Sequence, residues 1–214
     1  MGILARAGTG WRIPLLLVVL LGLASSLGAC AARPPRSIDD GCAIFGERRR
    51  WYFSAKESYE RWGVPIHVQL AIIHQESRFR ANAKPPRRKI LWILPGPRAS
   101  DAAGYAQALE STWGEYRREA GNGGADRDDF GDAVDFVGWY AARSARELGV
   151  PKDDAFDLYL AYHEGNGGFR RGTYRGKPWL IRTARGVEVR ADRYHRQLAI
   201  CEDRFQRRWW QFWW

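Results

Sequence analysis

One glutamate, Glu76, lies at the end of a short and strongly apolar stretch, AIIHQES (residues 71–77). On a helix its side chain would project between those of Ile72 and Ile73, one turn away from each. Apolar neighbours disfavour the charged form of a carboxyl group, so we expect the pKa of Glu76 to rise toward neutrality. A general acid that works near pH 7 needs such a pKa. The same pattern also fits a structural glutamate that binds a backbone amide or an arginine.

Short motifs follow one another along the chain in a recognisable order. They are E-S-x-F (76–79), S-x-x-x-G-Y-A-Q (100–107), S-T (111–112) and A-Y-H-E-G (161–165). Together they resemble the ordered motifs of lytic transglycosylases of the SLT type, which share a lysozyme-like helical domain with goose-type lysozymes. The resemblance covers residues from about 60 to 170. It implies a mainly α fold of the lysozyme-like (goose-type/SLT) kind with a glycan cleft.

The resemblance implies that Glu76 is the single catalytic residue. Enzymes of this family cleave the β-1,4 bond between MurNAc and GlcNAc in peptidoglycan without water. The glutamate protonates the leaving oxygen and then, as a carboxylate, takes the proton of the muramyl C6 hydroxyl, which closes a 1,6-anhydro ring. One carboxylate suffices for this chemistry, whereas hydrolytic glycosidases generally need two. The partner would be the glycan strands of peptidoglycan, and no cofactor is expected.

Other residues of the motifs would bind the substrate. By the resemblance, Ser77 and Ser100 would help to place the glycan or the reacting carbonyl. Gln107 would contact sugar from the second motif, and Tyr162 would lie against Glu76 from the last one.

The sequence departs from the family pattern at two places. Tyr105 and Ala106 replace Leu-Met, so the ring of Tyr105 could stack on sugar in place of the methionine. His163 and Glu164 replace Asn-Ala. Glu164 is a second acid, which could face outward from the surface, alter the contacts with substrate or act as a base for water. The last role would make the enzyme a hydrolytic muramidase.

Two other classes of function compete with a catalytic one. A non-catalytic peptidoglycan-binding lipoprotein would keep the cleft, but it would gain nothing from a desolvated carboxyl group at Glu76. A zinc protein would draw its ligands from the histidines, which are His67, His74, His163 and His195. The sequence holds neither H-E-x-x-H nor a Cys/His ligand set, so we expect no metal.

Residues 1–29 have the pattern of a secretory signal peptide. Arg6 and Arg12 precede an apolar run, residues 13–23, which is shorter than the ~20 residues that a membrane-spanning helix needs. The sequence L-G-A-C (27–30) resembles a bacterial lipobox, in which cleavage falls before Cys30 and the cysteine is acylated. An ordinary signal peptide with an incidental cysteine is the alternative. Ala31, where an aspartate would signal inner-membrane retention, favours the outer membrane with the protein facing the periplasm.

Two cysteines, Cys42 and Cys201, remain once Cys30 is assigned to lipidation. In an exported protein two such cysteines usually pair. Their disulfide would close a loop of ~160 residues and add roughly 4–5 kcal/mol to the free energy of unfolding on the chain-entropy model. Two free thiols are the alternative.

The chain is strongly basic, with a formal net charge of +10. Such an excess favours polyanionic surroundings. For an exported lipoprotein these are anionic lipid headgroups or the acidic peptide stems of a cell wall, and not nucleic acid. The length predicts one domain, residues 42–203, behind a lipidated tether, residues 30–41, and we expect a monomer. The basic, tryptophan-rich tail, residues 204–214, suits a membrane interface or is a disordered extension.

Apolar periodicity and helix-stop residues predict a mainly helical chain without strands. Helices are expected before Gly63, from Pro65 onward, over 132–148 with a stop at Gly149, over 154–164 and from about 180 to 201. Residues 84–98, rich in proline and arginine, are expected to form an irregular loop that could lie as a flap over the cleft. The Gly/Asp-rich residues 121–129 lack EF-hand spacing and are expected to form a plain loop.

Overall fold

The computed structural model describes residues 33–90 and 94–206. The chain divides into two compact units, residues 1–31 and 32–214, and every described residue belongs to the second. The expected signal peptide, the lipidation site Cys30 and the tryptophans of the tail therefore lie outside the described residues.

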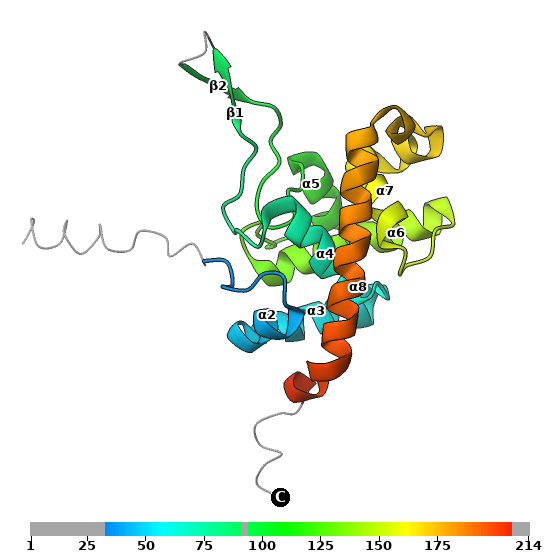
Figure 1. Cartoon of the computed structure of the whole chain (residues 1–214). Helices are drawn as coiled ribbons and strands as arrows, with labels where there is room; N and C mark the ends of the chain where they lie inside the picture. The colour runs from blue at the N-terminus through cyan, green and yellow to red at the C-terminus, as the bar shows by residue number, and fades with distance from the viewer. Residues whose placement is uncertain (1–32, 91–93, 207–214) are drawn as a thin grey trace, which may run out of the picture. The chain divides into compact units, whose positions relative to one another are not determined.

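The described part of the chain is mainly helical, as the sequence predicts (Figure 1). In chain order its helices are α2 (Gly41–Glu47), α3 (Arg49–Trp62), α4 (Ile66–Ser77), α5 (Glu110–Glu119), α6 (Phe130–Leu148), α7 (Ala155–Arg171), the 3-10 helix η1 (Thr173–Gly176) and α8 (Pro178–Gln206).

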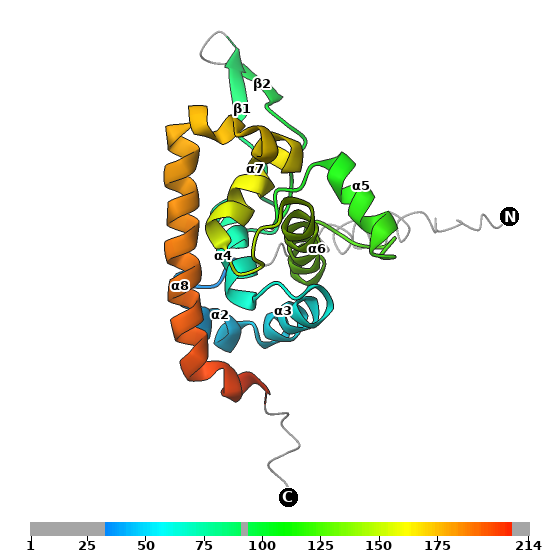
Figure 2. The ribbon, with the colours of Figure 1, turned by 90° about the vertical axis from the view of Figure 1, so that its right-hand side faces the viewer.

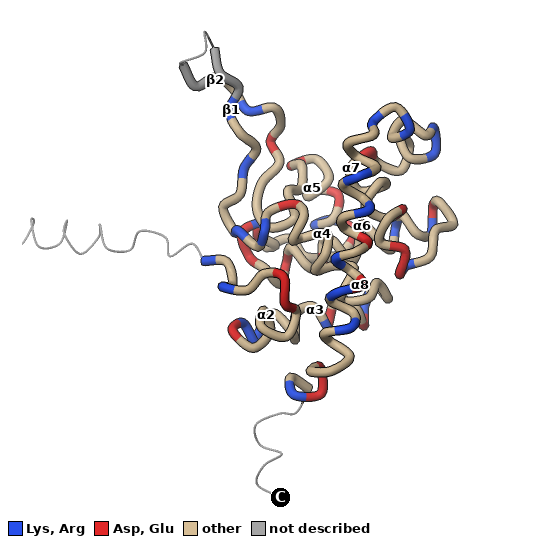
Figure 3. The backbone as a smooth tube through the Cα atoms, viewed as in Figure 1, with Lys and Arg blue, Asp and Glu red and all other residues tan. Residues whose placement is uncertain are grey.

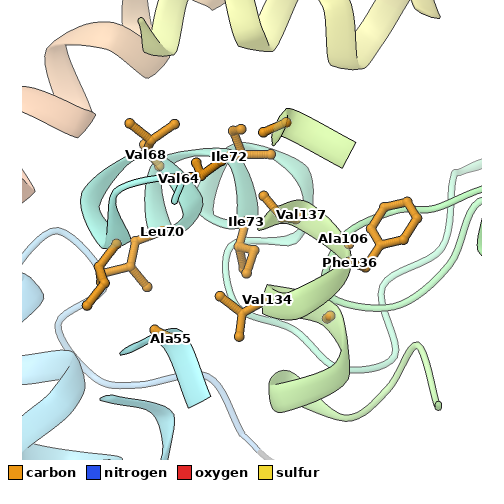
Figure 4. Packing of buried hydrophobic residues seen from close by; sticks show 14 of the residues in the cluster. Ala55, Val64, Val68, Leu70, Ile72, Ile73, Ala106, Val134, Phe136 and Val137 are labelled. Atoms are coloured by element: carbon orange, nitrogen blue, oxygen red, sulfur yellow. The ribbon is translucent and has the colours of Figure 1, made fainter. Parts of the chain in front are cut away.

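The helix that carries Glu76, α4, is the centre of the core. It contacts α3, α6, α7 and α8, and α8 runs along α4 and α7 in both views of the ribbon (Figures 1 and 2). Its apolar side chains are buried on all sides, and Ile73 lies beside Val134 and Val137 of α6 (Figure 4). Burying one such side chain stabilises the fold by about 1.5–3 kcal/mol. The position of Glu76 is therefore fixed by a helix that is buried along most of its length.

Several helix ends lie where the sequence places them. Helix α3 ends at Gly63 and α6 ends at Gly149, both in the left-handed conformation that favours glycine. Pro65 immediately precedes the first residue of α4. Asp129 caps the start of α6 by accepting a hydrogen bond from the backbone N–H of Asp132 at 3.1 Å.

The last helix is longer than predicted, whereas the helix expected over 154–164 does end there. Gly165 (φ 71°, ψ 156°) has a non-helical backbone, and a second helical segment follows it to Arg171, so α7 consists of two segments joined by a kink. Helix α8 reaches Gln206, so the expected domain boundary at residue 203 falls inside a helix.

The segment expected to be an irregular loop, residues 84–98, contains the two strands of the described chain, and the prediction of no strands is wrong. Strand β1 (Arg87–Ile90) pairs antiparallel with β2 (Leu94–Arg98), with Arg87 opposite Arg98. The prolines of β2 misled the prediction. In a two-stranded ribbon each strand keeps one free edge, where a residue without an N–H does not break the ladder.

The predicted disulfide between Cys42 and Cys201 is present and joins α2 to α8. The end of the expected tether is also attached to the domain. Asp40 caps α2 by accepting from the N–H of Cys42 at 2.8 Å, and Tyr194 of α8 donates to the carbonyl of Ile38. A tether that ends at residue 41 is therefore too long, because the residues from about 38 onward are part of the folded domain.

Among the described residues, no helix has the length and apolar character required to cross a membrane.

Candidate active site

Glu76 lies in the last turn of α4, directly before an unusual turn of the backbone. Arg78 (φ 54°) and Phe79 (φ 59°) both adopt the left-handed conformation, which costs energy for residues other than glycine. The ring of Phe79 is fully buried and stacks on Trp51, with 6.0 Å between ring centroids. Packing of Phe79 thus holds the strained turn and, with it, the direction of the Glu76 side chain.

Glu76 is half-buried as a residue, and its carboxyl group is withdrawn from water. This burial raises its pKa from 4.5 to about 7, and a hydrogen bond with the hydroxyl of Tyr159 partly opposes the rise. Burial and the nearby charge of Glu76 also raise the pKa of Tyr162 well above its usual range. Two tyrosines of α7 therefore lie next to Glu76.

Tyr159 is a site residue that the motifs did not identify. It is 4% exposed and lies three residues before Tyr162 on α7, so both side chains share one helix face. That spacing was the available signal, because a residue one turn before Tyr162 lies on the helix face that the resemblance directs toward Glu76.

The second motif forms a tight turn that positions Gln107. Gly104 (φ 77°) is required there, since a Cβ atom would lie 2.1 Å from the carbonyl oxygen of Arg127. Gln107 itself has a φ of 48°, and its Nε2 donates to the carbonyl of Ala83 at 2.8 Å and of Gly104 at 2.9 Å. These two bonds fix the amide, which leaves Oε1 to accept a hydrogen bond from a ligand.

A pocket of about 280 Å³ brings three of the four motifs together. It lies between the second motif and helices α5, α6 and α7, and its lining residues are Gln107, Ala108, Leu109, Thr112, Phe136, Tyr140, Tyr162, His163, Glu164 and Gly165. Aromatic walls with a few polar groups are typical of a site for a small ligand. The pocket adjoins Glu76 through Tyr162, whose pKa responds to the charge of Glu76.

A larger pocket, of about 730 Å³, contains none of the motif residues. It lies beside the opposite end of α4, with His67, Asp192 and His195 among its lining residues. Size alone would point to the wrong end of the helix, so the chemistry of Glu76 identifies the candidate active site.

The sequence profile of the family described as Transglycosylase SLT domain matches residues 18–201. The chain belongs to the transglycosylase SLT family. The helical architecture agrees with the lysozyme-like fold expected of an SLT domain. The protein is accordingly a peptidoglycan-acting enzyme of the lytic transglycosylase kind. None of the curated proteins matches the sequence.

Two residues of this SLT domain that were expected to contact the glycan are buried. Tyr105 is only 1% exposed, and its ring packs edge-on against Trp51 and Phe130, so it is not available to stack on sugar. Ser77 is also 1% exposed, and its hydroxyl donates to the carbonyl of Ile73 at 3.2 Å. Ser100, in contrast, lies exposed after β2.

The second acid of the SLT domain, Glu164, is not an outward-facing surface residue. Its side chain is 4% exposed and accepts from Lys177 Nζ at 2.7 Å, from the hydroxyl of Thr173 and, at 3.0 Å, from Nδ1 of His163. Burial would raise its pKa, but these hydrogen bonds outweigh burial and lower the pKa to about 2. A carboxylate with that pKa and three donors is a poor base for water.

The four histidines do not form a shared site. His67 lies against His195, with 4.7 Å between ring centroids, while His74 is buried and its Nδ1 is 2.9 Å from the hydroxyl of Tyr194. His163 lies at the pocket beside Glu164. Within residues 33–90 and 94–206, no group of three His, Cys, Asp or Glu residues could hold a metal ion.

Proposed function

We propose that this SLT-domain enzyme cleaves the β-1,4 bond between MurNAc and GlcNAc and leaves 1,6-anhydromuramyl ends. The observation that carries the proposal is the pKa of Glu76, about 7, next to a pocket in which Glu164 is the one acidic lining residue. Because Glu164 is held by three donors, Glu76 is the carboxyl group that can exchange a proton with substrate.

The reaction needs Glu76 first as an acid and then as a base. Protonated Glu76 gives its proton to the glycosidic oxygen as the bond from that oxygen to C1 of MurNAc breaks. The resulting carboxylate takes the proton of the C6 hydroxyl, whose oxygen bonds to C1 and closes the anhydro ring. A pKa near 7 suits both steps. The Tyr159 hydroxyl stabilises the carboxylate between the steps, because its hydrogen bond to Glu76 favours the charged form.

A hydrolytic muramidase is disfavoured by the same geometry. Inverting hydrolysis requires a second carboxylate to activate water, and a retaining hydrolase generally uses one as a nucleophile. Glu164 has a pKa of about 2, and an ammonium group and two other donors occupy its oxygens. Its environment supports a structural role and not proton abstraction from water.

Substrate contacts are assigned to the pocket and its rim. Gln107 accepts from a sugar hydroxyl or acetamido N–H through Oε1. Tyr162 lines the pocket next to Glu76, and its hydroxyl donates to the carbonyl of Ala106 at 2.6 Å. His163 lies at the rim, and the exposed Ser100 is free to contact the glycan. Ser77 acts indirectly, by supporting the last turn of α4.

We also propose that acyl chains on Cys30 anchor the enzyme to the outer membrane, facing the periplasm. The motif L-G-A-C (27–30) supports this proposal, and the tail with its tryptophans would add an interfacial contact. Lysines and arginines occur along the whole described chain (Figure 3), and the sequence has a formal net charge of +10, which suits a location near anionic headgroups and acidic stem peptides.

One digestion tests the reaction. Purified sacculi are incubated with the enzyme, and the released muropeptides are analysed by mass. Anhydro ends that disappear with Glu76→Gln support the proposal. Reducing ends would show a muramidase, and no release would show a binding protein. Anchoring is tested separately, because labelled palmitate should enter the parent protein and fail to enter Cys30→Ala.

A further inference from the structure

Beyond the pocket, the end of α7 is joined to the start of α8 by polar contacts, and we call residues 173–179 the α7–α8 corner. Lys177 of the corner donates to Glu164 at 2.7 Å. Thr173 donates to the same carboxylate and, at 3.1 Å, to the carbonyl of Gly168. One nearly buried carboxylate thus holds both ends of η1 against α7. Charge-assisted bonds of this kind are about twice as strong as neutral ones.

The corner presents a large aromatic side chain next to the pocket. Trp179, in the first turn of α8, is 50% exposed. Its ring meets that of His163 edge to face, with 5.2 Å between centroids and an interplanar angle of 77°. His163 lines the pocket, so Trp179 lies next to a residue of the pocket wall.

The two residues of the last motif that differ from the family pattern, His163 and Glu164, both contact residues of this corner. His163 contacts Trp179, and Glu164 binds Lys177, which stands two residues before Trp179. The two substituted residues of α7 therefore act as a pair: one contacts the indole, and the other holds the backbone that carries it. If His163 and Glu164 only stabilised the fold, half of the Trp179 indole would not need to stay exposed to solvent.

An exposed, pre-positioned indole suits the apolar face of a pyranose ring. Burial of apolar sugar C–H groups on an aromatic face is favourable, and little conformational freedom is lost when the ring is already held. His163 adds an imidazole N–H or lone pair for a hydroxyl of the same sugar.

We propose that Trp179 and His163 form an additional sugar-binding subsite at the outer end of the pocket, with Glu164 and Lys177 as positioning residues. This inference rests on the proposed function, since it assigns a further unit of the same glycan strand to the site. The ligand class is a β-1,4-linked chain of N-acetylated amino sugars, long enough to extend from the pocket to the corner.

The test measures binding without turnover. Oligomers of N-acetylglucosamine, from the disaccharide to the hexasaccharide, are titrated calorimetrically into the Glu76→Gln protein. Adding Trp179→Ala is expected to weaken binding of the longest oligomer about 3- to 10-fold and to leave the shortest unchanged, while Trp179→Phe restores most of the affinity. Phe53→Ala, on α3, is the matched control, because Phe53 is 42% exposed and does not line the pocket; it should bind like the parent.

The positioning residues are tested in the same titration. Lys177→Met removes the ammonium group from Glu164 and should reproduce part of the length-dependent loss. A general loss of stability would instead weaken all oligomers alike. Unchanged affinity in Trp179→Ala, an equal loss in Phe53→Ala or absence of binding by the parent would each overturn the subsite. The sacculus digestion decides the proposed function independently, since anhydro ends can form whether or not Trp179 contributes to binding.

Discussion

Glu76 and Glu164 are two shielded glutamates at one site whose pKa values move in opposite directions. Glu76 lies at the end of α4, and the one hydrogen bond that affects its pKa comes from Tyr159. Its pKa rises to about 7. Glu164, on α7, receives donors from Lys177, Thr173 and His163, and its pKa falls to about 2. Burial raises the pKa of both groups, but at Glu164 three donors, one of them a lysine ammonium group, outweigh it, whereas the single tyrosine hydroxyl at Glu76 does not.

The largest expected effect of this difference is on activity. Glu76→Gln should lower the rate of release of anhydro muropeptides about 10²- to 10⁴-fold, because the general acid is lost. Glu164→Gln should still release anhydro ends, at a reduced rate, because its carboxylate does not exchange protons with substrate. Mass analysis of digested sacculi measures both. Reducing ends that depend on Glu164 would reverse the assignment of the two residues.

Ionisation of Glu76 should destabilise the fold, whereas ionisation of most acidic side chains stabilises it. Its folded pKa, about 7, lies above the unfolded value of 4.5, so its contribution is fully present below pH 4.5 and is lost as pH rises through 7. At pH 8 the Glu76→Gln protein should therefore have a larger free energy of unfolding than the parent, by about 3 kcal/mol at most. It should accordingly unfold at a higher temperature. Thermal unfolding at several pH values measures this gain, which should vanish near pH 4.

Glu164 should stabilise the fold in the usual sense. Its folded pKa, about 2, lies below the unfolded 4.5, so its contribution is present above pH 4.5 and is lost as pH falls toward 2. Glu164→Gln should lower the unfolding free energy at pH 7 by about 1.5–3 kcal/mol, since it weakens a charged hydrogen-bond group. Glu110→Gln is the control. Its partner is Arg127 at 2.7 Å, but Glu110 is 59% exposed, so the loss should be under about 1 kcal/mol. Equal losses in both variants would contradict the structural role of Glu164.

The smallest expected effect is a shift in the pH profile. Activity should fall as pH rises through about 7, because Glu76 must start each cycle protonated. Tyr159→Phe removes a hydrogen bond that lowers the pKa of Glu76, so the alkaline limb should move upward, by less than about one pH unit. The pH dependence of muropeptide release by the two proteins measures the shift. A downward shift would mean that the hydroxyl favours the protonated acid.

The features that local spacing controls could be predicted from the sequence. Ile72 and Ile73 lie one turn from Glu76 on the same helix, so their effect on its pKa follows from helix geometry alone. Gly63 and Gly149 end their helices for equally local reasons. The disulfide was predictable because few cysteines were available in a chain whose first residues have the pattern of a secretory signal peptide.

The rest depended on contacts between distant segments. The partners of Glu164, Thr173 and Lys177, lie beyond the end of α7, and no helix periodicity relates them to it. Tyr105 was expected at the sugar, because a motif gives the order of residues but not the direction in which a side chain points; its ring fills the space beside Trp51. The strands of residues 87–98 were missed because prolines favour loops in isolation, whereas a paired ribbon tolerates them.

The bridge between Cys42 and Cys201 makes the intervening chain a closed covalent ring. The exposed Arg87 and Arg98 of the hairpin lie within this ring, between α4 and the second motif. A protease that cuts after either arginine would place Glu76 on one fragment and Gln107 with Tyr162 on the other. The two fragments would nevertheless remain one molecule, and they would separate in a denaturing gel only after reduction. Proteolytic clipping at the hairpin therefore does not by itself release the acid from the residues that bind its substrate.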